Sequence, residues 1–388
     1  MIEHIEIEGF KSLEKVSLDL GALNIFVGTN ASGKTNFLEA LRVLQGIGYG
    51  YTVEEIFNGK AKGANSEVWD GVRGGSAFAA FHRPAPEMDP EGGVVQFRVR
   101  ASLPLIGETA HYAISISARD GSVDSENLSV DGRVVCPPLP GNLAIDKSSP
   151  VLLQFIDAAL GASVHDFDIA SSLCWQLRDM QALDPSPSVQ REYSRSSVAN
   201  RMGDHGENFA ALIKTILKDD ANASAYVSWL KELTPTELDT VEVLPGAAGD
   251  WLFALRRNGV DYPAPVLSDG TLRFAAIAAA FFQPSLPQIL VLEEIENALH
   301  PTRLRLLVEL LKSQAGKGIS QVMATSHSPF AISWLKEEDY RTVFLCTKDE
   351  KTGASSITPF SSIPRLMELA RKQPIADLFA EGWLESAI

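Results

Sequence analysis

The stretch Gly28-Thr29-Asn30-Ala31-Ser32-Gly33-Lys34-Thr35 matches the pattern G-x-x-x-x-G-K-[ST]. Two glycines at this spacing let the backbone fold so that successive N–H groups point inward, where they suit phosphate oxygens. Lys34 would reach the β- and γ-phosphates of a nucleotide, and the Thr35 hydroxyl would bind magnesium. The loop therefore predicts a site for ATP and Mg²⁺. Its binding residues would be Gly28, Asn30, Ser32, Gly33, Lys34, Thr35 and the following Asn36.

The residues on either side of the loop have the patterns of a strand and a helix. Residues 24–27 form a short apolar run that leads into the first glycine, and apolar positions recur at helical spacing over 34–44. A helix that starts at the end of such a loop adds its positive N-terminal end to the site. Strand, loop and helix in this order favour phosphate binding over a structural glycine turn.

Composition limits the classes of protein that the chain can belong to. Its 388 residues are 45% apolar, enough for two or three domain-sized units with buried cores. A net charge of −15 disfavours attraction of the whole surface to DNA or anionic lipid, although a local basic strip is compatible with it. No apolar run approaches the ~20 residues of a membrane helix, and no signal peptide pattern precedes the first strand. We expect a cytoplasmic protein with no membrane partner.

Three sections of the chain differ in pattern. β-rich segments with turns between them follow the first helix, at 77–82, 94–103 and 111–118. Beyond a stretch rich in proline and glycine at 136–142, helical patterns dominate, at 151–160, 171–183, 208–217 and 223–233. Strands and helices then alternate again, at 251–256, 271–282, 289–292, 302–314, 321–324 and 343–346. The alternation predicts an α/β core interrupted by a helical insert.

Two acids follow a buried strand in the last section. The run Ile289-Leu290-Val291-Leu292 ends in Glu293 and Glu294. An acid at a strand end beside a phosphate loop can hold the water shell of magnesium, and Glu293 has that place. Glu294 would polarise an attacking water as general base. The alternative is that both are solvated acids at the start of a loop.

Two further segments have polar residues at element ends. Ser268 and Gly270 open the helical pattern at 271–282, where free N–H groups and the helix dipole suit an anion; a plain N-cap is the simpler explanation. His327 follows the strand pattern at 321–324 and could hydrogen-bond a γ-phosphate, although taken alone an ordinary loop histidine is the better explanation. Arg191, Arg195 and Arg201 in the insert favour a solvated helix face over a phosphate contact.

Taken together, these segments resemble the ATP-binding-cassette (ABC) superfamily. The resemblance is to the branch that includes SMC proteins, RecF, the ATPase half of OLD-family nucleases and stand-alone AAA-family ATPases without a Toprim nuclease domain. It covers roughly residues 1–60 and 250–335. Walker A would be 28–35, the signature 267–273, Walker B 289–294, the D-loop region 296–301 and the H-loop 325–328. Lys11 lies where this branch has a basic residue that can approach the nucleotide.

The resemblance implies a fold and a division of the chain. The fold is α/β: a P-loop ABC-type ATPase head, with a mixed sheet, flanking helices and an antiparallel β subdomain, into which a helical lobe is inserted. We expect the head to comprise residues 1–142 and 246–388, with the helical lobe at 143–245. Two departures stand out: Glu293 replaces the commoner aspartate, and Ile295 stands where many relatives have proline. The longer acid is compatible with slow hydrolysis.

The resemblance also implies a mechanism. In this superfamily two heads close on two nucleotides, so the signature Ser268 of one head would cap the γ-phosphate held by the other head's P-loop, with Gly270 beside it. Thr35 and Glu293 would hold magnesium, Glu294 would be the base, and His327 would contact the γ-phosphate. The chain would then be a homodimer whose closure is gated by ATP.

The sequence says less about what such a switch controls. Residues 328–388 contain no D-x-D pair of a Toprim nuclease, and the pair Asp166–Asp168 lies in the insert. The insert is also too short for an SMC coiled coil. We therefore expect an ATPase that acts in bacterial anti-phage defence with an effector or nuclease supplied in trans. The alternatives are a RecF-like DNA-repair ATPase that clamps DNA, and a nucleotide sensor with little hydrolysis.

Overall fold

The computed structural model describes residues 1–60, 69–82, 93–136, 146–150, 152, 154, 163–195, 198–233 and 238–386. The chain divides into two compact units. Unit 1 comprises Met1–Met180, Glu338–Glu368 and Trp383–Ile388. Unit 2 comprises Gln181–Glu337 and Leu369–Gly382. No helix in the described part of the chain is long and apolar enough to cross a membrane.

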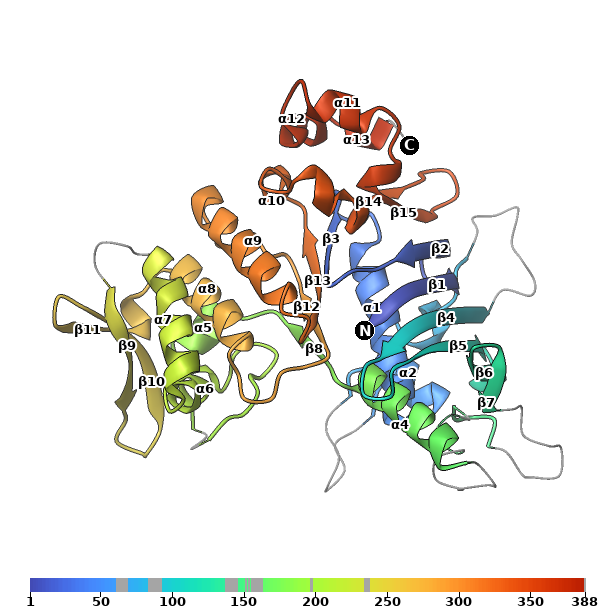
Figure 1. The fold of residues 1–388 in the computed structure, drawn as a ribbon, viewed down its shortest axis with the longest axis horizontal. Helices are drawn as coiled ribbons and strands as arrows, with labels where there is room; N and C mark the ends of the chain where they lie inside the picture. Colours follow the sequence, from blue (N-terminus) through green and yellow to red (C-terminus); the bar gives the residue numbers. More distant parts are fainter. Residues whose placement is uncertain are drawn as a thin grey trace. The chain divides into compact units, whose positions relative to one another are not determined.

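Unit 1 contains a six-stranded antiparallel sheet (Figure 1). Its order is β2 (Leu13–Asp19), β1 (Ile2–Phe10), β4 (Val94–Leu103), β5 (Glu108–Ser117), β6 (Ser122–Val130) and β7 (Arg133–Cys136). Apolar and polar residues alternate along the strands, so Ile5 and Ile7 are buried on one face while Glu6 and Glu8 lie on the other. The expected antiparallel β subdomain is therefore present.

A second group of strands in unit 1 supports the glycine loop. The strand β3 (Leu23–Val27) pairs in parallel with β14 (Val343–Lys348), which pairs with the antiparallel β15 (Ser355–Pro359). The helix α1 (Lys34–Tyr49) starts at the end of the loop. The ring of Phe26 lies 4.4 Å from that of Phe37 on α1 and 4.9 Å from that of Phe344 on β14. This apolar contact holds strand and helix together below the loop.

The other elements of unit 1 are short or lie beside α1. They are α2 (Val53–Asn58), η1 (Ser76–Phe78), α4 (Val164–Arg178), η4 (Phe360–Ser362) and α13 (Trp383–Ser386). The helix α4 packs against α1, and η3 (Glu337–Arg341) and α11 (Leu366–Ala370) lie where the chain passes between the units in sequence. Cys174 and Cys346 are buried and free.

Unit 2 is built around the parallel pair β12 (Ile289–Leu292) and β13 (Gln321–Ser326). Its principal helices are α8 (Asp269–Ala280) and α9 (Pro301–Ala315). A three-stranded antiparallel sheet has the order β11 (Val260–Pro263), β10 (Trp251–Arg257), β9 (Leu238–Pro245) (Figure 1). The remaining elements are α5 (Pro187–Gln190), α6 (Phe209–Ile216), α7 (Asp220–Leu233), η2 (Ala264–Val266), α10 (Pro329–Ile332) and α12 (Ile375–Ala380).

Contacts of α8 hold the helices of unit 2 together. Every residue from Gly270 to Ala280 is buried, because alanines let neighbouring elements approach closely. Tyr226 on α7 is fully buried, and its hydroxyl donates to the Ala275 carbonyl at 3.0 Å. Burial raises the pKa of the Tyr226 hydroxyl well above its usual value, so it stays protonated as a donor.

Two expected elements differ in the structure. Residues 77–82 were expected to form a strand, but the chain forms the turn η1 there, and a single bridge joins Ala80 to Phe10. Residues 171–183 were expected to form one helix, but α4 ends at Arg178 and the strand β8 (Met180–Leu183) follows. The helix expected at 151–160 lies almost entirely outside the described residues.

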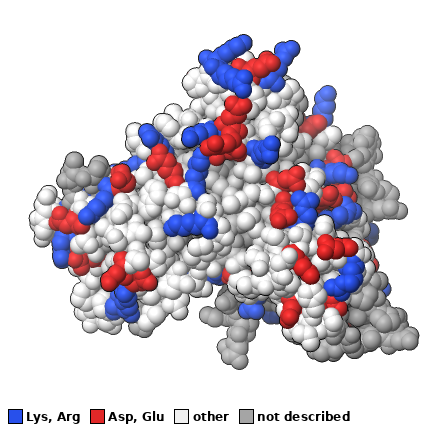
Figure 2. Space-filling view, viewed as in Figure 1, with Lys and Arg blue, Asp and Glu red and all other residues white. Residues whose placement is uncertain are grey.

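On the face drawn in Figure 2, lysine and arginine side chains lie among aspartate and glutamate side chains. The described residues of that face form no continuous basic field. This distribution agrees with the net charge of −15.

Candidate functional site

The glycine loop is tightly packed in unit 1. A Cβ atom at Gly28 would lie 2.3 Å from the Cys346 carbonyl oxygen, and one at Gly33 would lie 2.4 Å from the Ser355 hydroxyl oxygen. Gly33 also has a φ of 106°, a conformation that side chains rarely adopt. Both glycines are therefore required by the geometry of the loop, and each lets the backbone approach β14 or β15.

The ammonium group of Lys34 is held inside the loop. Its Nζ donates to the carbonyls of Gly28 at 2.7 Å and Thr29 at 2.8 Å, and the side chain is buried. The Ser32 hydroxyl is buried as well, yet its oxygen has no hydrogen-bond partner among the described residues. A buried cation and an unsatisfied hydroxyl side by side favour an anion as the ligand.

Polar side chains surround the start of α1. Asn36 Nδ2 donates to the Ser12 hydroxyl at 2.6 Å, and the Ser355 hydroxyl donates to the same oxygen at 2.7 Å. Thr35 is half-exposed on the first turn of α1, while Asn30 is exposed at the tip of the loop. A half-exposed hydroxyl directly after the lysine has the chemistry of a magnesium ligand.

Lys11 is engaged elsewhere in unit 1. Its Nζ lies 2.5 Å from a carboxylate oxygen of Glu39 on α1 and donates to the Arg73 carbonyl at 2.8 Å. Glu39 also accepts from the Arg73 backbone N–H at 2.9 Å. Both partners of the Lys11–Glu39 pair are about nine-tenths buried, so the lysine would have to leave a strong ion pair to approach a nucleotide.

The predicted acids of unit 2 both follow the carboxyl end of β12, which is parallel to β13. Leu292 is in register with Ala324, so Glu293 and Thr325 follow at the same edge. The Thr325 hydroxyl accepts from the Glu294 backbone N–H at 3.0 Å. Glu293 is half-exposed and Glu294 is exposed with a φ of 47°, which turns the chain sharply away from the strand. The Glu294 carboxylate accepts from Asn297 at 2.6 Å.

His327 is fixed by an acid that sequence reasoning missed. The Glu296 oxygen Oε1 accepts from the His327 backbone N–H at 2.5 Å and lies 2.9 Å from the ring atom Nδ1. The Glu296 side chain is 9% exposed, whereas that of His327 is 41% exposed. A carboxylate on Nδ1 leaves Nε2 as the ring nitrogen available to another group. The only sequence signal was the position of Glu296 within the D-loop region.

The signature segment opens α8 as expected. Ser268 is the N-cap, and its hydroxyl accepts from the Thr271 backbone N–H at 3.3 Å. A Cβ atom at Gly270 would lie 2.5 Å from the Ala298 carbonyl oxygen, so this glycine lets the D-loop region approach the helix. Arg191, expected on a solvated helix face, instead donates to Asp269 and to the Leu267 carbonyl.

A buried arginine ties α8 to the acids. Arg273 is 4% exposed and donates to the carbonyls of Glu293 at 2.9 Å and Glu294 at 3.2 Å. Its other nitrogen donates to the Asp184 carboxylate at 2.9 Å and the Pro185 carbonyl at 2.8 Å. The guanidinium therefore fixes the backbone from which both acids project, a role that sequence reasoning missed.

The predicted site residues thus form two sets. Unit 1 holds Lys11, Gly28, Asn30, Ser32, Gly33, Lys34, Thr35 and Asn36, and unit 2 holds Ser268, Gly270, Glu293, Glu294 and His327. Within the described residues no three side chains of His, Cys, Asp or Glu gather as a ready metal cluster.

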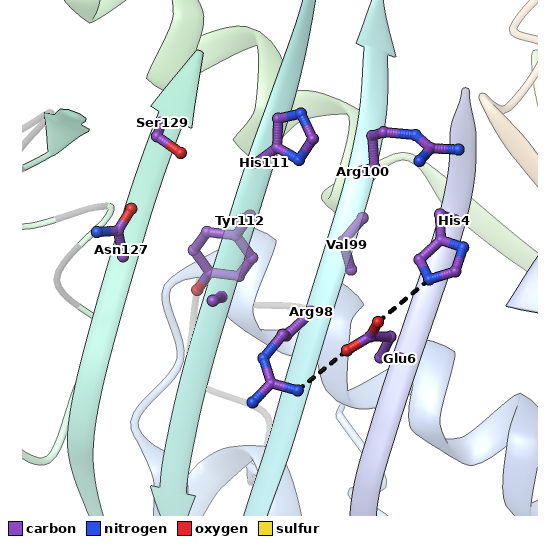
Figure 3. A pocket seen from close by; sticks show the side chains of 10 residues that line it. His4, Glu6, Arg98, Val99, Arg100, His111, Tyr112, Asn127 and Ser129 are labelled. Carbon is purple, nitrogen blue, oxygen red and sulfur yellow. Dashed lines mark hydrogen bonds and ion pairs between the residues drawn. The ribbon is translucent and has the colours of Figure 1, made fainter. Parts of the chain in front are cut away.

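A pocket of about 330 Å³ lies apart from these residues, on the open face of the antiparallel sheet (Figure 3). Glu6 there accepts from Arg98 at 3.0 Å and lies 3.4 Å from His4. The hydrogen bond from Arg98 holds the pKa of the Glu6 carboxyl below its usual value. Arg100 lies 3.4 Å from Glu3. These charges are paired within the sheet, and we assign the pocket no ligand.

Two family models match the sequence. Residues 1–63 match the model described as "AAA ATPase domain". Residues 217–333 match the model described as "AAA domain, putative AbiEii toxin, Type IV TA system". No curated protein matches the sequence.

Solved structures resemble the whole chain. An SMC head domain with an extended coiled coil, bound to the C-terminal domain of ScpA and derived from Pyrococcus furiosus, is 12% identical with a TM-score of 0.55. That match covers 95% of this chain and 99% of the other. An SMC head bound to the C-winged helix domain of ScpA is 14% identical with a TM-score of 0.54, covering 92% and 96%.

At these identities the structural matches show the fold alone, which is that of a P-loop ABC-type ATPase head. The two family models match the segments that carry the glycine loop and the strand-end acids. The chain thus has the fold of an SMC head, and two of its segments are similar to AAA-domain families.

Proposed function

We propose that the chain binds ATP with magnesium, hydrolyses it to ADP and phosphate, and acts as an ATP-gated homodimer. We further propose that this dimer controls a separately encoded effector or nuclease in bacterial anti-phage defence. The glycine loop carries the proposal. There, the buried Lys34 ammonium and the unsatisfied Ser32 hydroxyl lie together at the start of α1.

The loop would bind the phosphates by exchanging its internal contacts. The carbonyls of Gly28 and Thr29 now accept from Lys34, and both are neutral acceptors. Phosphate oxygens are anionic and bind an ammonium more strongly. The backbone N–H groups of the loop and the first turn of α1 would add donors, and Asn30, Gly33 and Asn36 would line the site.

Thr35 and three residues of unit 2 supply the chemistry of hydrolysis in this proposal. Thr35 and Glu293 would hold magnesium, which supplies charge neutralisation at the phosphates when bound. Glu294 is exposed and would take the proton of the attacking water. His327 would contact a γ-phosphate oxygen through Nε2, since Glu296 faces Nδ1.

The comparisons support a partner protein and the defence role by analogy. Two similar SMC heads are described as bound to a domain of ScpA, so heads of this fold bind partner proteins. The family model over residues 217–333 names a toxin of a toxin–antitoxin system. An effector or nuclease encoded beside this chain would fit both observations.

Nucleotide titration tests the core of the proposal. Wild-type protein should bind ATP, and Lys34→Ala should weaken binding by at least about tenfold, because the phosphates lose their buried cation. Glu294→Gln should retain ATP binding while hydrolysis falls by about 10²-fold or more. Retained tight binding by Lys34→Ala would falsify the assignment of the loop. Unchanged turnover by Glu294→Gln would remove that residue as the base.

A further inference from the structure

Arg303 lies beside Ser268, the signature serine that would cap a γ-phosphate. It belongs to the first turn of α9, and its Nη1 lies 3.4 Å from the Ser268 hydroxyl and 3.4 Å from the Thr271 hydroxyl. Both are long for hydrogen bonds, which centre near 2.9 Å for N–H donors. The guanidinium is therefore only weakly held where it lies.

Neighbouring arginines of unit 2 are neutralised, whereas Arg303 is not. Arg191 pairs with Asp269, and Arg305 pairs with Glu309 at 2.8 Å. No carboxylate lies within ion-pair distance of Arg303 among the described residues. A permanently charged group with five donors and two long contacts retains most of its capacity for an anion.

Gly270 of the signature allows the charged Arg303 side chain to lie at the start of α8. Gly270 has room for no side chain, because a Cβ atom there would lie 2.5 Å from the Ala298 carbonyl oxygen and 3.5 Å from Arg303 Nη1. The close approach sets the first turn of α9 against the first turn of α8. Since Arg191 already neutralises Asp269, Arg303 adds an uncompensated positive charge to the positive end of α8.

We propose that Arg303 binds the γ-phosphate of the ATP held by the P-loop of a second copy of this chain, beside Ser268. The inference deepens the proposed function and rests on it. A planar guanidinium can donate to two phosphate oxygens at once, which the serine hydroxyl cannot.

Arg303 would stabilise the negative charge of the γ-phosphoryl group during hydrolysis. In hydrolysis the water oxygen bonds to the γ-phosphorus, and the bond from that phosphorus to the bridging oxygen breaks. The electron pair stays on ADP, and the water proton goes to Glu294. Negative charge on the equatorial γ-oxygens needs a fixed cation, and an arginine supplied from a partner is worth up to about 10³–10⁵ in turnover in related chemistry.

The first test compares Arg303→Gln with Arg305→Gln. The control position lies on the same helix and is 57% exposed, and its charge is paired with Glu309. Arg303→Gln should lower kcat by about 10²-fold or more, while ATP affinity of the dilute single chain stays within about twofold of wild type. Arg305→Gln should hydrolyse like wild type. An equal kcat for Arg303→Gln and wild type would overturn the inference.

The second test locates Arg303 in the partner chain. In a mixture of Lys34→Ala and Arg303→Gln proteins, a heterodimer has one P-loop with Lys34 that faces a partner with Arg303. Activity should therefore reappear in the mixture, although each protein alone is inactive. If labelled chains exchange but the mixture stays inactive, Arg303 does not act in trans and the inference fails.

The third test separates a phosphate contact from mere support of Ser268. In a Ser268→Ala background, Arg303→Gln should still lower kcat by a further tenfold or so, because the guanidinium has its own contact. If it lowers kcat only when Ser268 is present, Arg303 merely orients the hydroxyl, and the inference is overturned. Titration of the wild-type protein with ATP tests the proposed function itself. If the wild type binds no ATP, both the proposed function and this inference are wrong.

Discussion

At the scale of single residues, Glu296 shows how a role arises from a contact between distant positions. It lies 31 residues before His327 in the sequence, and its carboxylate still faces both the backbone N–H and the ring of that histidine. The side chain is nearly buried, so the ring has one preferred orientation. A carboxylate at Nδ1 fixes the orientation of the ring and leaves Nε2 as the nitrogen that faces away from Glu296.

Glu296→Ala should therefore reduce hydrolysis without removing nucleotide. We expect turnover to fall by about tenfold or more, because the ring loses the partner of Nδ1, whereas ATP affinity should change by less than about threefold. Steady-state kinetics and nucleotide titration measure the two quantities. Glu309→Ala is the matched control, because that acid is 49% exposed and pairs only along its own helix. If both variants hydrolyse ATP equally fast, His327 does not depend on Glu296.

The sequence predicted residues whose role depends on local spacing. The loop of residues 28–35 requires two glycines, and the structure shows the close approaches that exclude a Cβ atom at both. The sequence pattern did not predict contacts between residues that are far apart in the chain. Nothing near Lys11 indicated its ion pair with Glu39 on α1, and nothing near Arg273 indicated the carbonyls that it binds.

At the scale of elements, α8 is positioned by one buried guanidinium. Arg273 accounts for hydrogen bonds to three carbonyls and one carboxylate, on two different segments of unit 2. The side chain of Arg273 is 5% exposed, whereas that of Asp184 is 56% exposed, so the carbonyls rather than the ion pair dominate the expected effect. Loss of the arginine would leave buried acceptors unsatisfied.

Arg273→Met should lower the free energy of unfolding by about 2–4 kcal/mol, since the buried acceptors lose their donor. Urea unfolding followed by circular dichroism measures the change. The matched control is Arg371→Met, because Arg371 is 71% exposed and its pair with Glu337 is worth about 0–1 kcal/mol. Equal stability of the two variants would show that the network around Arg273 contributes little.

Elements were predicted well where the pattern changes clearly at their ends. The strand at 289–292 has the bounds expected from its apolar run, and α8 begins two residues before the expected start because Ser268 caps it. The strand β8 and the segment at 77–82 were predicted wrongly. β8 has four residues, too few to distinguish a strand from the last turn of a helix, and its chain direction changes at Asp179. Residues 77–82 are nearly all apolar, as in a buried strand, but they follow a turn in which Gly74 and Gly75 have positive φ.

At the scale of the whole molecule, the proposed site is complete only in a dimer. A mixture of Ser268→Arg and Lys34→Ala proteins should recover activity, because each heterodimer combines one intact P-loop with one intact signature. Each variant alone should hydrolyse ATP at least about 10²-fold more slowly than wild type. Activity is measured by phosphate release after chain exchange. Exchanged mixtures that remain inactive would argue for a site made by one chain.

Cys346 gives the glycine loop a chemical property of its own. Its carbonyl lies against Gly28, and burial raises the pKa of its thiol to about 12, although the nearby Lys34 ammonium opposes the shift. The thiol is thus protonated at neutral pH and inaccessible, so maleimides and oxidants should spare it while the loop keeps its shape. Labelling of Cys346 would then report transient opening of the loop, and bound nucleotide should slow that labelling.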